Sequence, residues 1–349
     1  MRPLVVVGPF PPPWGGISVH VRALQRLARA NGIPVRIYDT GAGHGARDGS
    51  EGIHRGGGAS GVAAAVRGAY GHPLHVHISG NNAKAWLVAL SLGRPFGRGG
   101  PGALLTVHSG LAPAFLQPRA HRELARAATI GFRRVFCTNE SIADALHAAG
   151  VAASRLEVLS PFLPDPDPPA PPPAELRSLR ARARPLLVAA VAEGHQYGVD
   201  VLLAAVPELA RRHPRMGLCL FGPSAERIDP EALAPLGDRA LVFGPLDHRL
   251  ARACIAAADV FVRPTRADGD SVSVREALDL GVRVVASAVG KRPPEATLFA
   301  PGDASDLVRA VGASLALPAP SGGRAAEDAA QRLIAAWEEI GISFGRKSA

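Results

Sequence analysis

The arrangement of apolar residues limits the fold more than any other feature of the sequence. Short runs of apolar residues alternate with longer amphipathic stretches over residues 1–163, and the alternation starts again near residue 186. Such runs are typical of strands buried on both faces, and their alternation with helices predicts a parallel sheet between two helical layers. The sequence therefore predicts two tandem α/β domains, each a doubly wound, Rossmann-like sheet.

Six runs in the first half are expected to form strands. They are Leu4–Val7, Val35–Tyr38, Leu74–Ile78, Leu104–Val107, Val135–Cys137 and Leu156–Leu159. The expected helices between them are Val19–Ala30, Ala83–Leu92 and Ser141–Ala149. The glycine-rich stretch Gly41–Gly61 interrupts this pattern and predicts an unusually long loop.

The second half repeats the pattern. Its expected strands are Leu186–Val191, Leu218–Phe221, Leu241–Phe243, Val260–Val262, Val282–Ala286 and Thr297–Phe299. Its expected helices are Val199–Arg212, Arg249–Ala257, Val274–Leu280, Ala304–Leu315 and a last amphipathic helix, Ala326–Ile340.

A proline-rich segment, residues 161–173, separates the two halves. Such a composition is typical of a stiff, extended linker. We therefore expect a first domain over residues 1–163, completed by the C-terminal helix at about 326–349, and a second domain over 164–325. A pair of such domains is expected to share a ligand cleft at the interface between them.

Composition excludes several classes of protein. With 349 residues and 47% hydrophobic content, the chain has enough apolar residues for two cores, which excludes a disordered protein. No apolar run is long enough to span a membrane or to form a secretory signal. The three cysteines, Cys137, Cys219 and Cys254, have neither metal-binding nor disulfide-framework spacing, so we expect a cytoplasmic protein.

Positive charge is concentrated in the first half. Residues 1–163 contain 17 Lys and Arg against 7 Asp and Glu, whereas the whole chain has a net charge of +9. One interpretation is an arginine-rich coding bias. The other is an anionic partner, either a phosphorylated acceptor or the inner face of a membrane. Nucleic acid is disfavoured because no zinc-finger spacing or RNA-binding signature is present.

Two loops have the composition of ligand sites. The first follows the first strand and contains Trp14, Gly15 and Gly16, whose glycines permit positive φ and close approach of the backbone to a ligand. The helix after it begins with amides that can bind an anion. The alternative is an ordinary tight turn between a strand and a helix.

The second loop, Arg263–Leu278, lies between a strand and a helix of the second domain. Asp270, Ser271 and Ser273 are suitable N-caps, so the opening amides of the helix can bind a diphosphate. Asp268 and Glu276 flank these amides, and carboxylates beside a phosphate site suit the hydroxyls of a ribose and a sugar. The alternative for Glu276 is a capping box with Ser273.

Three other features could bind a metal or a ligand but are weaker. Asp268 and Asp270 form an Asp-x-Asp sequence, which can hold a divalent ion. His75 and His77 share one face of a strand, yet no acidic residue or cysteine lies near them in sequence. We therefore predict no metal, and His20 is either a packed helix residue or a ligand contact.

The chain resembles GT-B glycosyltransferases of family 4 over essentially its whole length. The resembling segments are Gly15–His20, Val76–Ile78, Thr106–Gly110, Thr138–Ser141, Tyr197–Asp200, Phe221–Pro223 and, above all, Asp268–Leu278. The last resembles the E-x7-E motif of that family, with Asp268 in the first acidic position and Glu276 in the second.

The resemblance implies a retaining enzyme with a nucleotide-sugar donor. Glu276 would accept hydrogen bonds from the ribose, Asp268 would contact the donor sugar, and the amides near Ser271 and Val272 would hold the distal phosphate. Gly16 would let the first loop close on the same diphosphate, and His108 would lie by the reacting centre. Catalytic roles therefore fall to His108, Asp268 and Glu276. The implied donor contacts are Gly15, Gly16, Gly222, Arg263, Ser271, Val272 and Glu276.

One departure concerns the phosphate-binding cations. The family usually has an Arg and a Lys on the first loop of the second domain, where this chain has Ala192 and Tyr197. The candidates to replace them are Arg263, Arg266, Arg275, Lys291, Arg292 and a protonated His195.

The predicted function is transfer of a hexose from a nucleotide-diphosphate sugar, expected to be a UDP-sugar, to a saccharide or lipid-linked saccharide in bacterial glycan assembly. Trp14 and His20 are the predicted acceptor contacts, and no metal or other cofactor is expected. Alternatives are a natural-product glycosyltransferase, a non-catalytic glycosyltransferase-like binding protein, and a sugar-phosphate epimerase or phosphorylase.

Overall fold

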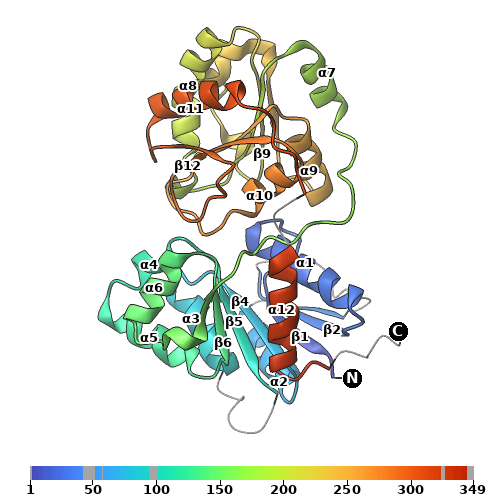
Figure 1. The fold of residues 1–349 in the computed structure, drawn as a ribbon, viewed down its shortest axis with the longest axis vertical. Helices are drawn as coiled ribbons and strands as arrows, with labels where there is room; N and C mark the ends of the chain where they lie inside the picture. Colours follow the sequence, from blue (N-terminus) through green and yellow to red (C-terminus); the bar gives the residue numbers. More distant parts are fainter. Residues whose placement is uncertain (1, 42–51, 57, 94–100, 324–326, 344–349) are drawn as a thin grey trace. The chain divides into compact units, whose positions relative to one another are not determined.

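The structure is a computed structural model that describes residues 2–41, 52–56, 58–93, 101–323 and 327–343. It divides the chain into two compact units. The first comprises Met1–Leu163 and Ala326–Ala349, and the second comprises Pro164–Ala325. Each unit is a parallel sheet covered by helices (Figure 1).

The first unit contains a seven-stranded sheet in the order β3-β2-β1-β4-β5-β6-β7. Its strands are β1 (Leu4–Gly8), β2 (Val35–Asp39), β3 (Ile53–Arg55), β4 (Leu74–Ile78), β5 (Ala103–Val107), β6 (Arg134–Cys137) and β7 (Leu156–Val158). The order reverses between β1 and β4. Ligands of doubly wound sheets bind outside the carboxyl ends of the strands at such a point.

Two helical layers cover this sheet. One contains α1 (Gly16–Ala30) and α12 (Glu327–Glu339). The other contains α2 (Gly58–Ala69), α3 (Ala83–Gly93), α5 (Arg119–Thr129) and α6 (Glu140–Ala148), with the short α4 (Ala112–Phe115). Between α6 and β7 lies a 3-10 turn, η3 (Ala153–Arg155).

The C-terminal helix α12 is part of the first unit, although it is far from it in sequence (Figure 1). Trp337 is fully buried, and its Nε1 donates a hydrogen bond to Nδ1 of His75 in β4 at 3.3 Å. Arg332 donates from Nε to Oε1 of Glu157 in β7 at 2.8 Å. Helix α12 therefore covers the apolar face of a sheet formed by the first half of the chain.

The second unit contains a six-stranded sheet in the order β10-β9-β8-β11-β12-β13. Its strands are β8 (Leu186–Ala190), β9 (Gly217–Phe221), β10 (Ala240–Phe243), β11 (Val260–Arg263), β12 (Arg283–Ser287) and β13 (Thr297–Phe299). The order reverses between β8 and β11, so the carboxyl ends of these strands mark the expected ligand edge.

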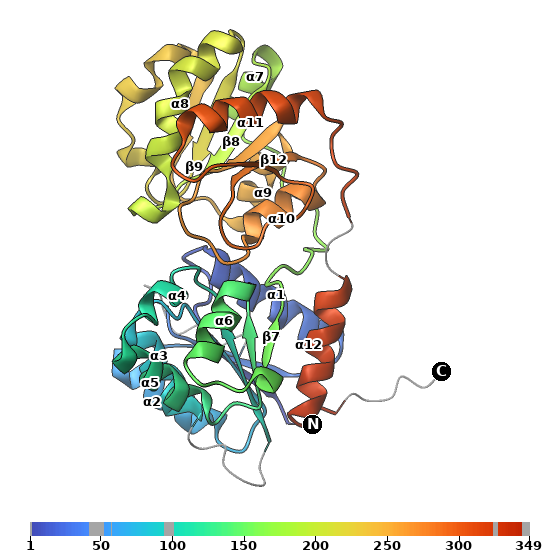
Figure 2. The ribbon, with the colours of Figure 1, turned by 60° about the vertical axis from the view of Figure 1, so that its left-hand side comes forward.

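Helices cover both faces of this second sheet (Figure 2). One layer contains α8 (Val199–Arg212), α11 (Ala304–Ala316) and the 3-10 segments η5 (Ala225–Arg227) and η6 (Pro230–Arg239). The other contains α7 (Ala174–Arg182), α9 (His248–Ala256) and α10 (Val272–Asp279). A further turn, η4 (His195–Tyr197), follows β8.

The predicted fold class of two parallel α/β sheets is confirmed. The prediction of one long loop over Gly41–Gly61 is wrong, because β3 and the start of α2 lie within it; residues 42–51 and 57 lie outside the described residues. Strand β3 has no apolar run. It is fixed by tertiary contacts, including an ion pair between Arg55 and Asp39 with Nη1–Oδ2 at 2.9 Å.

Helix α5 was also missing from the expected elements. Its sequence is rich in arginine and alanine, and the residues that it buries are small: Ala125, Ala128 and Thr129. None of the helices in the described ranges is both long and apolar enough to cross a lipid bilayer.

Candidate functional site

The carboxyl edge of the second sheet carries the loop that the sequence singled out. The chain leaves β11 at Arg263, forms the loop 264–271 and enters α10 with Ser271 as the N-cap. The Ser271 side chain does not cap the helix; its Oγ lies 3.2 Å from Oγ of Ser273. The opening amides of α10 therefore have no side-chain cap, which is the arrangement of an anion site at a helix N-terminus.

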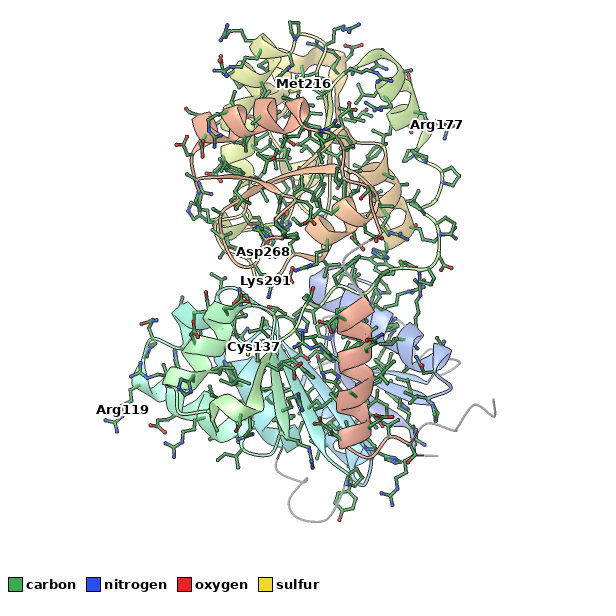
Figure 3. The ribbon with its side chains drawn as sticks, viewed as in Figure 1. Arg119, Cys137, Arg177, Met216, Asp268 and Lys291 are labelled. Atoms are coloured by element: carbon green, nitrogen blue, oxygen red, sulfur yellow. The ribbon has the colours of Figure 1, made fainter. Side chains whose placement is uncertain are left out.

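Asp268 lies on this loop between two arginines (Figure 3). Its Oδ2 accepts from Nε of Arg263 at 3.1 Å and from Nη1 of Arg292 at 3.2 Å. Burial alone raises the pKa of Asp268, but the two guanidinium groups outweigh it and lower the pKa below its ordinary value. Two cations around one carboxylate leave a net positive charge beside the amides of α10.

The second carboxylate, Glu276, is on the first turns of α10 and is largely buried. Its Oε1 lies 2.5 Å from Nε2 of His248 in α9, and Nδ1 of the same ring lies 3.5 Å from Oδ2 of Asp165. Burial lowers the pKa of His248, but its contacts with Asp165 and Glu276 outweigh burial and raise it to about 9. His248 is therefore protonated near neutral pH and fixes Glu276 in place.

This contact replaces the capping box between Glu276 and Ser273, which is not formed. The structure likewise pairs Asp270 with an arginine, since Oδ1 accepts from Nε of Arg275 at 2.6 Å. Both carboxylates of the Asp-x-Asp sequence thus lie against arginines.

The first loop of the second unit follows β8 and approaches the same edge. Gly198 has φ 64°, and a Cβ there would lie 1.8 Å from the carbonyl oxygen of Pro264. The lack of a side chain at Gly198 lets the two loops meet. Arg263 extends over the ring of Tyr197, with its Cζ 5.8 Å from the ring centroid. Tyr197, where the family has a lysine, thus positions an arginine.

Two of the other candidate cations are committed to specific partners. Arg266 makes two hydrogen bonds to the Asp200 carboxylate at 2.7 and 2.6 Å, and Arg275 pairs with Asp270. Gly222 has φ 136°, and a Cβ there would lie 2.0 Å from the carbonyl oxygen of Val191. The positive φ and the close backbone of Val191 therefore explain the glycine at position 222 without a ligand contact.

A recess of about 530 Å³ lies beside this edge, bounded by the segments that follow β8 and β9. Its lining includes Glu193, Asp200 and Asp229 with Arg227. The carboxylates disfavour an anion there, whereas hydroxyl groups of a ligand suit them.

The corresponding loop of the first unit leads from β1 into α1. Gly15 and Gly16 permit positive φ but do not adopt it: Gly15 is extended at φ −164°, and Gly16 is the first helical residue. A Cβ at either glycine would meet no atom within 4 Å in the described structure. The Ser18 hydroxyl accepts from the Gly15 amide at 2.9 Å and donates to the Pro13 carbonyl at 2.9 Å. Trp14 is half-buried, with Cζ of Arg22 5.2 Å from its ring centroid.

His108 directly follows β5 and lies among other histidines in the interior. Its Nε2 is 3.1 Å from Nδ1 of His77, and its ring centroid is 5.3 Å from that of His20. Burial lowers the pKa of His20 to about 4 and those of His77 and His108 well below the ordinary value. His20 is 2% exposed and therefore packs in the interior of the first unit.

Sequence reasoning missed His248 and Asp165. They lie on a different helix and in the linker, and only the packing of α9 against α10 brings His248 to Glu276. A histidine next to an aspartate N-cap, as in Asp247-His248, is too common a pattern to have indicated the contact.

Known proteins resemble the chain most clearly in its second unit. Residues 183–316 match the family model described as glycosyl transferases group 1.

One relative is a human protein, the A component of phosphatidylinositol N-acetylglucosaminyltransferase, which is 26% identical over 102 residues. That match covers 28% of this chain and 21% of the relative, so the chain matches about a fifth of the length of that protein.

Solved structures resemble the chain over both units. Anabaena HepE in complex with UDP-glucose has a TM-score of 0.64 at 16% identity and covers 90% of each chain. Sucrose-phosphate synthase from Thermosynechococcus elongatus has a TM-score of 0.66 at 20% identity and covers 97% of this chain and 96% of that one. The two-domain fold expected of GT-B glycosyltransferases is thereby confirmed.

The contact between His248 and Glu276 makes stability depend on pH. The folded-state pKa of about 9 exceeds the ordinary value of 6.5, so this stabilisation is complete below about pH 6.5 and is lost as the pH rises through 9. We expect His248→Gln to lower the free energy of unfolding by about 1–3 kcal/mol at pH 7 and by much less at pH 10. Denaturant unfolding at several pH values measures this. The control His213→Gln removes a histidine at the end of α8. If both variants change the pH dependence of the free energy of unfolding equally, the contact of His248 with Glu276 does not cause it.

Proposed function

We propose that the chain is a retaining glycosyltransferase that transfers a hexose from a UDP-sugar to a saccharide or lipid-linked saccharide acceptor. The observation that carries this proposal is the uncapped N-terminus of α10, flanked by Glu276 on one side and by the Asp268 arginine pair on the other. The match of residues 183–316 to group 1 glycosyl transferases supports it. So does the UDP-glucose complex of HepE, which shares the fold.

In this proposal the diphosphate binds at the amides of Ser271 and Val272. Glu276, held by His248, accepts hydrogen bonds from the ribose hydroxyls. Asp268 is fully charged beside its arginines and accepts from the donor sugar. Carboxylates beside a phosphate repel it unless hydroxyl donors and nearby cations offset their charge. The loop supplies these cations as Arg263 and Arg292.

Charge accumulates on the leaving phosphate as the glycosidic bond breaks. Amides and cations that are already oriented stabilise that charge without reorganisation. We assign this role to the α10 amides with Arg263 and Arg292, which replace the cations absent at Ala192 and Tyr197. The leaving phosphate then helps to deprotonate the acceptor on the same face of the sugar.

The acceptor belongs to the first unit in this proposal. Helix α5 carries Arg119 (Figure 3), with Arg122 and Arg126 against Glu123, and the neighbouring Ile130 is 72% exposed. A basic surface with an exposed apolar residue suits an anionic membrane carrying a lipid-linked acceptor. The human relative belongs to a glycosyltransferase named for phosphatidylinositol, which supports a lipid acceptor.

Nucleotide binding is the first test. We expect UDP to raise the thermal midpoint with or without EDTA, and Glu276→Gln to weaken UDP binding at least about tenfold because a ribose contact is lost. Glu208→Gln, on the exposed face of α8, is the matched control and should bind like the wild type. A wild type that is stabilised by no nucleoside diphosphate contradicts the donor site and favours a glycosyltransferase-like protein of another function.

Mutation distinguishes the proposed catalytic role of Arg263 from the structural pairing of Arg266. We expect Arg263→Gln to lower kcat/KM for the UDP-sugar by about tenfold or more, because a cation near the leaving phosphate is lost. Arg266→Gln breaks the pair with Asp200 and the hydrogen bond to the His195 carbonyl, and it should change kcat/KM little. Steady-state kinetics compare them; equal losses in both variants would show that Arg263 has no special role.

A substitution at Gly16 tests whether the first loop contacts the donor. A methyl group at Gly16 meets no atom, so we expect Gly16→Ala to leave stability unchanged or slightly raised while it slows transfer at least about tenfold by obstructing the donor. Gly312→Ala, in α11, is the control: it also meets no atom and should stabilise by about 0.5–1 kcal/mol without slowing transfer. An unchanged transfer rate in Gly16→Ala overturns the contact.

Membrane binding is tested by sedimentation with anionic and neutral liposomes at low and high salt. We expect binding to anionic liposomes that salt weakens, and a loss of binding in Arg119→Glu/Arg126→Glu. Arg211→Glu, on an exposed helix of the second unit, should bind like the wild type. A lack of preference for anionic lipid removes the membrane from the proposal and leaves a soluble acceptor.

A further inference from the structure

Three histidines from separate elements meet in the interior of the first unit. His20 lies on α1, His77 lies in β4, and His108 directly follows β5. One ring nitrogen of each lies within 4.8 Å of one ring nitrogen of both others. The ring centroids form a nearly equilateral triangle with sides of 5.2, 5.3 and 5.4 Å.

This triangle has the dimensions of a tri-histidine metal site. A tetrahedral zinc ion about 2.1 Å from three imidazole nitrogens places the ring centroids about 5 Å apart. The backbone of β1 lies close to His77, because a Cβ on Gly8 at the end of β1 would be 2.9 Å from Cβ of His77. The rings therefore lie at the point where the strand order of the first sheet reverses between β1 and β4.

Hydrogen bonding within the described structure leaves this cluster incomplete. Nδ1 of His77 faces Nε2 of His108 at 3.1 Å, but Nε2 of His77 is buried and has no hydrogen-bond partner. Either tautomer of His77 leaves that nitrogen unsatisfied, which is unfavourable for a buried polar atom. His77 is 2% exposed, so bulk water does not compensate this. An ion between the rings would take the lone pairs of His77 Nδ1 and His108 Nε2 in place of their contact with each other.

His20 is held as metal-binding histidines usually are. Its Nδ1 is hydrogen-bonded to the backbone carbonyl of Pro161, which fixes the ring and leaves Nε2 for coordination. The surrounding burial keeps the imidazoles neutral, the form that binds metals.

We propose that His20, His77 and His108 bind one divalent zinc-class ion, with its fourth position open to water or to a ligand oxygen. Three neutral imidazoles favour zinc or a neighbouring transition metal over magnesium or calcium, which prefer oxygen ligands. Three protein ligands with one open position are typical of zinc sites that act on a bound ligand. The inference goes beyond the proposed donor site, which lies in the second unit and needs no metal.

His75 is the matched control, because it lies in the same cluster without a free nitrogen. Its ring centroid is 4.2 Å from that of His77, yet Nε2 contacts Thr106 Oγ1 at 2.8 Å and Nδ1 accepts from Trp337 at 3.3 Å. Loss of His75 removes an equally buried imidazole but no metal ligand.

The experiment titrates the chelator-stripped full chain with Co²⁺ and then displaces it with Zn²⁺. We expect one equivalent of Co²⁺ with the strong visible absorption of a tetrahedral site, displaced by Zn²⁺, and a rise of the thermal midpoint with Zn²⁺. His20→Gln and His108→Gln should each weaken Zn²⁺ at least about tenfold, whereas His75→Gln should keep the wild-type affinity.

The absence of saturable Co²⁺ or Zn²⁺ binding by the wild type overturns the proposal, and this result requires no variant to fold. Equal affinity in His20→Gln, His108→Gln and the wild type overturns it as well. This experiment measures bound metal, whereas the donor site is tested by UDP binding in the presence of EDTA. Failure of one of the two proposals is therefore distinguishable from failure of the other.

Discussion

The parallel sheet with a reversed strand order is the constraint on which both units depend. When neighbouring strands lead to connections on opposite sides, their carboxyl ends leave a crevice that no connection fills. In the first unit the crevice lies between β1 and β4, and in the second between β8 and β11. The candidate residues for catalysis and donor binding lie on loops, strand ends or helix starts near these two points.

Electrostatics then determines what each crevice can bind. In the second unit, two arginines on Asp268 and a protonated His248 on Glu276 let carboxylates lie beside an anion site. Without these cations, two buried carboxylates and a diphosphate would repel one another. In the first unit, buried imidazoles lie near the point where the strand order reverses, and neutral imidazoles suit a metal or hydroxyl ligand better than a phosphate.

The sequence predicted the buried strands because most of them are short runs dominated by apolar residues, as in Leu4–Val7 and Val260–Val262. It did not predict β3 or α5, whose residues become ordered through tertiary pairing or bury only small side chains. Of the candidate site, the sequence indicated the loop with Asp268 and Glu276, because capping residues and carboxylates are local patterns. It did not indicate His248 or the approach of His20 to His77, since these depend on how a helix packs on a sheet.

Amide hydrogen exchange of the full chain with and without UDP tests the central claim most directly. The account predicts that UDP slows exchange in the α10 opening, residues 271–276, and in the loop 191–198, and that Glu276→Gln abolishes this protection. Protection confined to the first unit, or protection of the second unit only at residues 224–229 and not at the start of α10, would contradict a diphosphate site at the start of α10.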